Sequence, residues 1–498
     1  MEILQINLGK SRAASNQLEQ ICQENNPSFI CIQEPYTLGG KISGIPIKNT
    51  VIASTNPKSA IVIREPNCSI FPLLAKPNII AIECSYNNMT IIIVNIYIPP
   101  LSEFDETLIE LDKIITSQQG KYLIITGDFN SKNAIWGGSI NDDRGDKLSE
   151  FFLVHNLFVL NEKYSQPTFE TTNGKSWIDL SVTSGELFPK VTHWEVADEE
   201  SLSDHKYITF GFFNAEPSVI RRLTKHGTAK LFEIIKKDPW FYNNPFIHNT
   251  ADDIEETLHI FYYRFESWLK KCEKNVKTHG RANPWWSEEL NITRKRVNAY
   301  RRRFQRSRNI ELRPLYKREY LDFRNEYKEM IVTSKITSWR NFCFDATKKS
   351  LFGIPYKIAF NKIKTPIIIP PITKIDNSKT TSHIESVEYI LDSVYAQDDI
   401  QTDSALLTNI RNSIKNTNSN PPDVKFTYQE IETIIVNLRL KTAPGIDKIT
   451  VSILKQIWEY HYLFIHEIFN SCLQFGHFPK TWKIGKVILL IKLNRPTN

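Results

Sequence analysis

The segment YLIITGDFN, residues 122–130, decides how the N-terminal part of the chain is interpreted. Its opening apolar run is typical of a buried strand, and Gly127, Asp128 and Asn130 follow at the end of that run. Side chains two positions apart face the same way in an extended chain, so we expect Asp128 and Asn130 to converge. The carboxylate can then accept a proton from water while the amide donates to a phosphate oxygen. A simple turn after a strand is the alternative, and the neighbouring motifs decide between the two.

Short runs rich in Ile and Val surround this motif and alternate with amphipathic stretches, which predicts buried strands and covering helices. The predicted strands are residues 1–8, 29–33, 60–63, 79–84, 90–98, 122–126, 157–160, 177–182 and 207–212. Helices are predicted near residues 15–23, 104–116 and 147–155. Many strands with few helices indicate stacked sheets covered by helices.

Polar side chains lie at the ends of several predicted strands. Ser203, Asp204 and His205 precede the last strand and place an imidazole beside a carboxylate, a pair suited to stabilising charge on a phosphorane-like transition state. Glu34 ends another strand, where a hard oxygen ligand can hold Mg²⁺. Asp179 lies among apolar residues and therefore needs a partner, for which His205 is the candidate. A structural histidine and a surface glutamate are the plainer alternatives.

Six segments taken in order resemble the endonuclease/exonuclease/phosphatase superfamily. They are QIN at 5–7, IQEP at 32–35, NIYIPP at 95–100, GDFN at 127–130, IDL at 178–180 and SDH at 203–205. The resemblance covers residues 1–213 and implies an α/β (α+β) fold, a four-layer α/β/β/α sandwich with its active site at the strand ends. The superfamily includes abasic-site endonucleases, deoxyribonucleases, phosphatases and sphingomyelinases, so the fold alone does not choose a substrate.

Carried over position by position, the resemblance implies a divalent metal site and a water-activating group. Glu34 would be the principal Mg²⁺ ligand, with Asn7 near it and Asp204 close to the metal, and Mn²⁺ is a possible substitute. Asp128 would activate or orient the attacking water, and His205 would stabilise the pentavalent transition state.

The resemblance also implies a set of groups around the phosphate. Asn130 and Tyr97 would hold the phosphate, while Asp179 would fix the tautomer and orientation of the catalytic histidine from behind. Thr168 matches a position that retrotransposon members use near the phosphate, and Ser203 is a further substrate-side candidate.

The charge balance changes sign along the chain. Residues 1–210 hold 16 Lys and Arg against 25 Asp and Glu, whereas residues 281–340 hold 16 against 7. From residue 285 onward, apolar residues fall at helical spacing, which predicts long basic helices. They suggest contact with a polyanion, although solvated helices are an equally simple interpretation. Residues 362–422 are rich in Pro, Asn, Ser and Thr and indicate a loop or loosely ordered connector.

The C-terminal segment carries a further series of motifs. Thr427 and Glu430 have the spacing of a capping box, and KTAPGIDKI at 441–449 and FNSCL at 469–473 follow. This series resembles the opening of a reverse transcriptase from a non-long-terminal-repeat (non-LTR) retrotransposon. Polymerase chemistry needs a carboxylate pair that the family places beyond this segment, so we expect no polymerase activity. The end at Asn498 suggests a premature stop or a partial gene model.

The sequence therefore predicts three regions: an endonuclease at 1–213, a basic helical linker and connector at 214–420, and the partial fingers region of a reverse transcriptase at 421–498. The expected activity is Mg²⁺-dependent nicking of target DNA, which exposes a 3′ hydroxyl for target-primed reverse transcription. An abasic-site repair endonuclease is the first alternative, but Leu8, Gly9 and Lys10 replace the extra acid that such enzymes tend to carry. A phosphatase and a non-catalytic nucleic-acid-binding relic are the others.

Cysteine spacing and hydropathy indicate the redox state of the thiols and the cellular compartment of the protein. The seven cysteines contain no C-x-x-C pair, which predicts free thiols with no disulfide and no zinc site. The sequence shows no secretory signal and no apolar run long enough to span a membrane. We therefore expect a protein made in the cytoplasm that acts in the nucleus. Its expected partners are DNA and the element's own RNA, and its oligomeric state stays open.

Overall fold

The computed structural model describes residues 1–46, 49–65, 68–86, 89–171, 174–213, 220–276, 282–360, 368, 370–395, 400–416, 424–485 and 487. These residues divide into two compact units, each discontinuous in sequence. One unit contains residues 1–213 with 282–395, and the other contains 220–276 with 400–487. The region predicted to be a linker is therefore divided between the two units.

Two six-stranded sheets form the centre of the first unit. The first contains, in order, β15 (Val191–Val196), β16 (Ile208–Phe212), β1 (Glu2–Asn7), β2 (Phe29–Gln33), β6 (Ser59–Ile63) and β5 (Thr50–Ala53). The second contains β11 (Leu157–Val159), β14 (Asp179–Ser184), β10 (Tyr122–Asp128), β9 (Met89–Tyr97), β8 (Ile79–Tyr86) and β7 (Ser69–Ala75). All nine predicted strands are present, whereas β5, β7 and β15 were not predicted.

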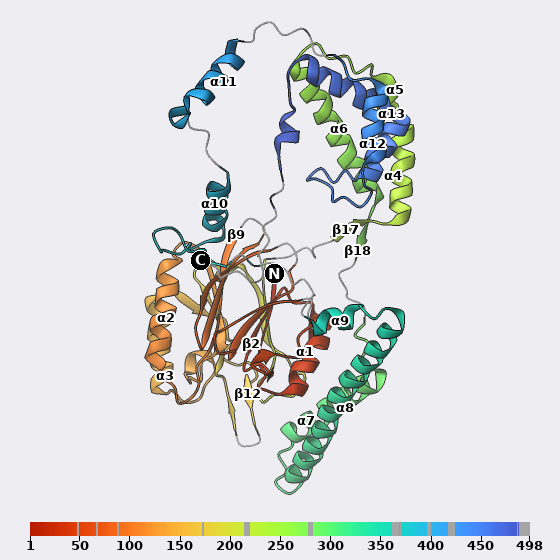
Figure 1. Ribbon diagram of the computed structural model, residues 1–498. Helices are drawn as coiled ribbons and strands as arrows, with labels where there is room; N and C mark the ends of the chain where they lie inside the picture. Colours follow the sequence, from red (N-terminus) through yellow and green to blue (C-terminus); the bar gives the residue numbers. More distant parts are fainter. Residues whose placement is uncertain are drawn as a thin grey trace. The chain divides into compact units, whose positions relative to one another are not determined.

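Helices cover both outer faces of the paired sheets, as Figure 1 shows. Helix α1 (Arg12–Asn25) packs on the first sheet, and α2 (Phe104–Ser117) and α3 (Asp143–Val154) pack on the second. The strands read as continuous apolar runs because both of their faces are buried. In β10, for example, Ile124 lies in the core between the sheets while Leu123 and Ile125 lie under the helices. The predicted four-layer α/β/β/α sandwich is confirmed.

Smaller elements complete this part of the chain. They are the hairpins β3 (Thr37–Leu38) with β4 (Lys41–Ile42) and β12 (Phe169–Glu170) with β13 (Lys175–Ser176), and the 3₁₀ turns η1 (Ala134–Trp136) and η2 (Phe188–Lys190).

The strand order brings the candidate residues to one edge. β1 runs parallel to β2 and β9 parallel to β10, so the carboxyl ends of these strands lie side by side within each sheet. Asn7 ends β1, Tyr97 ends β9 opposite Asp128, and β14 runs antiparallel with Asp179 opposite Asp128.

Gly127 lies in β10 opposite Ile96 of β9, where there is no space for a side chain. A Cβ atom at this position would lie 2.2 Å from the carbonyl oxygen of Ile96, so the two strands would have to separate. We expect Gly127→Ala to lower the free energy of unfolding by about 1–3 kcal/mol, as overpacking does. Thermal unfolding followed by circular dichroism would measure this. Gly174→Ala is the matched control, because its Cβ would meet nothing within 4 Å. Equal melting midpoints for the two variants would contradict the prediction.

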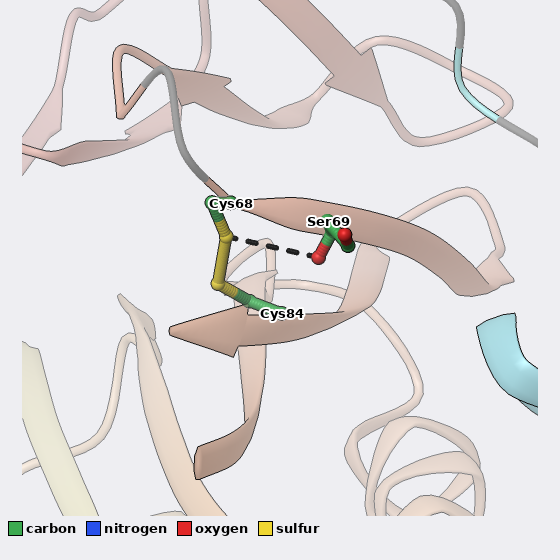
Figure 2. The surroundings of a disulfide bond; sticks show 3 residues. All are labelled: Cys68, Ser69 and Cys84. Carbon is green, nitrogen blue, oxygen red and sulfur yellow. Dashed lines mark hydrogen bonds between the residues drawn. A yellow bond between two sulfur atoms is a disulfide. The ribbon is translucent and has the colours of Figure 1, made fainter. Parts of the chain in front are cut away.

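The expectation of no disulfide is wrong at one place. Cys68 and Cys84 are joined by a disulfide, shown in Figure 2. Cys68 directly precedes β7 and Cys84 lies in β8, where Ile70 is its cross-strand partner, so antiparallel pairing brings the two Cα atoms to 6.3 Å. No spacing rule in the sequence identifies such a pair across two strands. The other five cysteines are free thiols.

Two long helices from the predicted linker also belong to the first unit. α7 (Glu288–Arg306) and α8 (Leu312–Lys349) form a helical hairpin, here called the α7–α8 hairpin. The predicted apolar stripe lies between them, with the ring of Tyr300 4.4 Å from that of Phe323. Buried side chains fix the hairpin against α1; they are Trp285, Leu290, Val297, Tyr327 and Ile331. Because of these buried contacts, residues 285–331 pack on the first unit.

The connector predicted at 362–422 is more ordered than expected. Residues 361–367 lie outside the described residues, but α10 (His383–Val394) and α11 (Ala405–Asn416) are regular helices, and α9 (Ile354–Ala359) precedes them. The hydroxyl of Ser382 accepts the backbone N–H of Glu385 and caps α10. The structure therefore places regular helices at residues 383–394 and 405–416 of this stretch. The 3₁₀ turn η3 (Ile400–Thr402) lies between them.

The second unit is mainly helical around an aromatic core. Besides η3 and α11, its elements are β17 (Ile220–Leu223), β18 (Glu273–Val276), α4 (Lys225–Lys237), α5 (Pro239–Asn243), α6 (Ala251–Cys272), α12 (Tyr428–Asn437), α13 (Val451–Gln474) and η4 (Lys480–Lys483). Phe241, Phe261 and Phe464 pack together at its centre. The predicted capping box of Thr427 and Glu430 is confirmed. None of the described helices in either unit is both long and apolar enough to span a membrane.

Candidate active site

Two buried carboxylates face each other at the edge where the strands end. Asp128 and Asp179 are directly opposite in the β10–β14 ladder, and each is 2% exposed. Like charges in such positions repel. His205 lies against both: its Nδ1 is 2.9 Å from each carboxylate oxygen of Asp179, and its Nε2 is 3.8 Å from Oδ2 of Asp128. The predicted pairing of Asp179 with His205 is therefore present, and the imidazole connects the two acids.

Burial and the neighbouring charges perturb these groups strongly. Burial, with the charge of Asp179 added, raises the pKa of Asp128 to about 7. Burial alone would lower the pKa of His205, but the charge and hydrogen bond of Asp179 outweigh it and raise that pKa to about 9. At neutral pH the imidazole is therefore protonated and positively charged, with its Nε2 directed toward Asp128.

Asn7 connects the first sheet to this group. Its Nδ2 donates to Oδ2 of Asp128 at 2.9 Å, and its Oδ1 accepts the backbone N–H of Gly9. Ser203 donates from its hydroxyl to the carbonyl oxygen of Asn7 at 2.7 Å and so ties the loop before β16 to the end of β1. The structure thus brings Asn7, Asp128, Asp179, His205 and Ser203 together.

Two predicted phosphate contacts lie differently from the expectation. Asn130 has a φ of +47°, so the extended alternation ends before it, and its side-chain amide donates to the carbonyl oxygen of Ile98. Its backbone N–H donates instead to Oδ1 of Asp128 at 3.1 Å. Thr168 is fully buried, and its hydroxyl oxygen accepts the backbone N–H groups of Ile178 and Asp179. In this structure Asn130 therefore contacts Asp128, and Thr168 contacts the backbone of Asp179.

Glu34 and Tyr97 form a second group beside the first. Glu34 follows β2 with a φ of +43°, and its carboxylate lies 3.2 Å from the exposed ammonium of Lys10. Burial, the charge of Glu34 and a hydrogen bond to that carboxylate raise the pKa of Tyr97, and the charge of Asp128 adds to the effect. Glu34 and Asp128 therefore both lie near the Tyr97 hydroxyl.

Asp204 is directed away from this centre. Its side chain is 56% exposed, and Oδ1 lies 3.4 Å from a guanidinium nitrogen of Arg324 in α8. Within the described part of the chain, one group of three acids and histidines has ligand atoms that all lie within 4.8 Å of one another, and it contains Asp128, Asp179 and His205. Asp204 and Glu34 are outside that group, so the predicted metal ligands do not gather around one point in this structure.

The donor set nevertheless suits a hard cation. The oxygens available at this edge come from carboxylates, which are ligands that Mg²⁺ prefers. Burial is the largest cause of the raised pKa of Asp128, and the charge of Asp179 adds to it, so a cation beside Asp128 would favour its ionised form.

Sequence reasoning missed a polar layer beneath these residues. Gln5 donates to the carbonyl oxygen of Gly127 and accepts from the hydroxyl of Ser181, and so bridges the two sheets. Asn95 donates to the carbonyl oxygens of Ile32 and Ala60. A signal was available, because Gln5 and Asn95 each stand two positions before the polar end of an apolar strand and so share its face.

A family model described as "Endonuclease-reverse transcriptase" matches residues 91–209, which include Tyr97, Asp128, Asp179 and His205. The Pol polyprotein of the type-1 retrotransposable element R1 of Bradysia coprophila is 22% identical over 484 residues, which cover 92% of this chain and 47% of that protein. The putative 115 kDa protein of element R1DM of Drosophila melanogaster is 23% identical, and the alignment covers 98% of this chain and 48% of that protein. The chain thus spans about half the length of these curated relatives.

Among solved structures, similar chains include the endonuclease domain of TRAS1, a telomere-specific non-LTR retrotransposon. It is 26% identical, covers 43% of this chain and 99% of its own, and has a TM-score of 0.39. An AP endonuclease from Archaeoglobus fulgidus is 17% identical and has a TM-score of 0.34, and the match covers 43% of this chain and 99% of that one.

Proposed function

We propose that residues 1–213 nick DNA in a Mg²⁺-dependent hydrolysis, a proposal supported by the match of residues 91–209 to the endonuclease-reverse transcriptase model and by the similarity to R1-type retrotransposon polyproteins. The observation that carries the proposal is a row of three buried side chains, Asp179, His205 and Asp128. Asn7 donates a hydrogen bond to the last of them at the strand ends. This row of side chains holds a protonated imidazole beside an acid, an arrangement suited to phosphodiester hydrolysis.

Each residue of the site has a proposed role. Asp179 orients His205 through Nδ1, so the Nε2 proton is directed at the developing charge on the phosphorane. Asp128 accepts a proton from the attacking water, and Asn7 fixes the carboxylate by donating to Oδ2. Tyr97 offers its hydroxyl to the phosphate.

We propose that Asp128 and Glu34 would hold the metal, with Asn7 beside them, because both carboxylates lie near the Tyr97 hydroxyl at the strand ends. A bound Mg²⁺ supplies Lewis-acid stabilisation of charge on the phosphate oxygens. Asp204 comes into this set only if its side chain leaves Arg324.

The similarity to polyproteins of retrotransposable elements supports a proposal for the biological role. We propose that the nick exposes a 3′ hydroxyl that primes reverse transcription of the element's RNA, in the nucleus. Residues 421–498 contain the aspartates Asp423 and Asp447, which are far apart in sequence, and no adjacent carboxylate pair of the kind that carries polymerase metals. We therefore propose that this stretch does not itself add nucleotides.

Supercoiled plasmid tests the proposal. The purified full chain with Mg²⁺ is expected to convert closed circles to open circles, and EDTA in excess of the metal is expected to stop the reaction. An abasic-site duplex and an intact duplex of the same sequence separate nicking of ordinary DNA from repair. Activity that persists in EDTA contradicts metal dependence, and cutting confined to the abasic duplex favours the repair alternative.

A further inference from the structure

The α7–α8 hairpin reaches the loop that carries Asp204 and His205. We propose that Arg324 is a positioning residue for that loop. The hairpin then contributes to the geometry of the nuclease site and is not only a connector to the next region. This inference rests on the proposed function and goes beyond it, because residues outside 1–213 then determine the geometry of the catalytic histidine.

Arg324 makes three contacts with the loop that links β15 to β16. Its Nε donates to Oε1 of Glu200 at 2.9 Å, and one Nη donates to the carbonyl oxygen of Ser203 at 2.8 Å. The same nitrogen lies 3.4 Å from Oδ1 of Asp204. A planar guanidinium can bridge such acceptors at once, which an ammonium cannot do in the same geometry.

The loop holds a strained residue that needs this support. Leu202 has a φ of +61° although it is a bulky, buried side chain. Such a conformation persists only where the surroundings hold it. The N–H of Leu202 donates to Oε1 of Glu200, the same oxygen that accepts from Arg324. Arg324 therefore acts through Glu200 and Ser203 on the backbone that leads to His205.

Other residues of the hairpin hold the same loop. Tyr320 donates from its hydroxyl to Oε2 of Glu200 at 2.7 Å, and Asn298 accepts the backbone N–H of Glu200 at 2.9 Å. Arg301 donates to Asp198 at the start of the loop. None of these residues belongs to the sheets, so an isolated sheet domain would lack every one of these contacts.

Kinetics of the full chain test the assignment. Arg324→Ala and Arg324→Lys are compared with Arg318→Ala, which removes the same charge from an exposed position of the same helix. We expect both Arg324 variants to lower kcat for plasmid nicking by about 10- to 100-fold, as small misplacements of catalytic groups do. KM for the DNA should change no more than in Arg318→Ala. Hydrogen exchange of the loop amides should increase in the Arg324 variants only.

Each outcome is decisive. If Arg324→Lys nicks like the wild type, positive charge alone suffices and the positioning role is wrong. If KM rises while kcat stays, Arg324 is only a DNA-binding cation. Loop exchange that matches the Arg318→Ala control also overturns the inference, even if activity is lost. If the wild-type chain does not nick, the proposed function fails, whereas hydrogen exchange still tests the contact between Arg324 and the loop.

Discussion

Replacing His205 by alanine is expected to reduce plasmid nicking by about a thousandfold or more, because the charged donor at the transition state is lost. The imidazole also separates two buried acids. Without it, Asp128 loses the imidazolium charge that lowers its pKa, while burial and the charge of Asp179 still raise that pKa. A protonated Asp128 cannot accept a proton from water, and both catalytic groups fail together.

The measurement is the rate of open-circle formation under single-turnover conditions, with the exposed His226 changed to alanine as the control. Thermal unfolding of each variant shows whether the fold persists. Retained nicking by a folded His205→Ala protein would refute the assigned site, and the non-catalytic nucleic-acid-binding alternative would then be preferred.

How far the sequence predicts the site depends on the distance between partners. Asn7, Tyr97 and Asp128 end strands whose apolar runs are unmistakable, so their convergence follows from parallel pairing. The pairing of Asp179 with His205 follows from the cost of burying an unpartnered carboxylate. Homology to the retrotransposon polyproteins was predicted from the same motifs and is confirmed.

The sequence fails where local conformation or a distant segment decides. Asn130 adopts a left-handed φ directly after the strand, so the alternation rule no longer applies to it. Asp204 has the sequence context of a metal ligand, but the guanidinium of Arg324 lies beside it. The two are 120 residues apart, and no periodicity in either segment predicts the contact. The Cys68–Cys84 disulfide is hidden in the same way.

Glu200 shows how strongly the hairpin and the sheets depend on each other. It is 2% exposed, and its carboxylate accepts from Arg324 and Tyr320 and lies 3.8 Å from Arg301. Burial alone would raise the pKa of Glu200, but Arg324 and Arg301, helped by the Tyr320 hydrogen bond, outweigh it and hold the pKa below its ordinary value of 4.5. The carboxylate is therefore ionised in the folded protein.

Glu200→Ala is expected to lower the free energy of unfolding of this unit by about 3–5 kcal/mol, because Arg324 and Arg301 lose the buried carboxylate that they share. Glu199→Ala is the matched control, since that neighbouring carboxylate forms no ion pair with any described residue. Urea unfolding followed by Trp fluorescence would compare the two, and equal midpoints would show that Glu200 contributes nothing to docking.

The same group sets a dependence on pH. Because the folded pKa lies below the unfolded one, the stabilisation from Glu200 is complete above the unfolded pKa and is lost as pH falls through the folded pKa. Between about pH 6 and about pH 3, the wild type should therefore lose more thermal stability than Glu200→Gln, which has no charge to titrate at this position. Other carboxylates titrate in both proteins, so the difference between the two curves isolates Glu200. If the two proteins lose thermal stability in parallel as pH falls, the charge of Glu200 does not stabilise the hairpin. The apolar contacts of Leu290, Val297 and Tyr327 with α1 would then hold the hairpin.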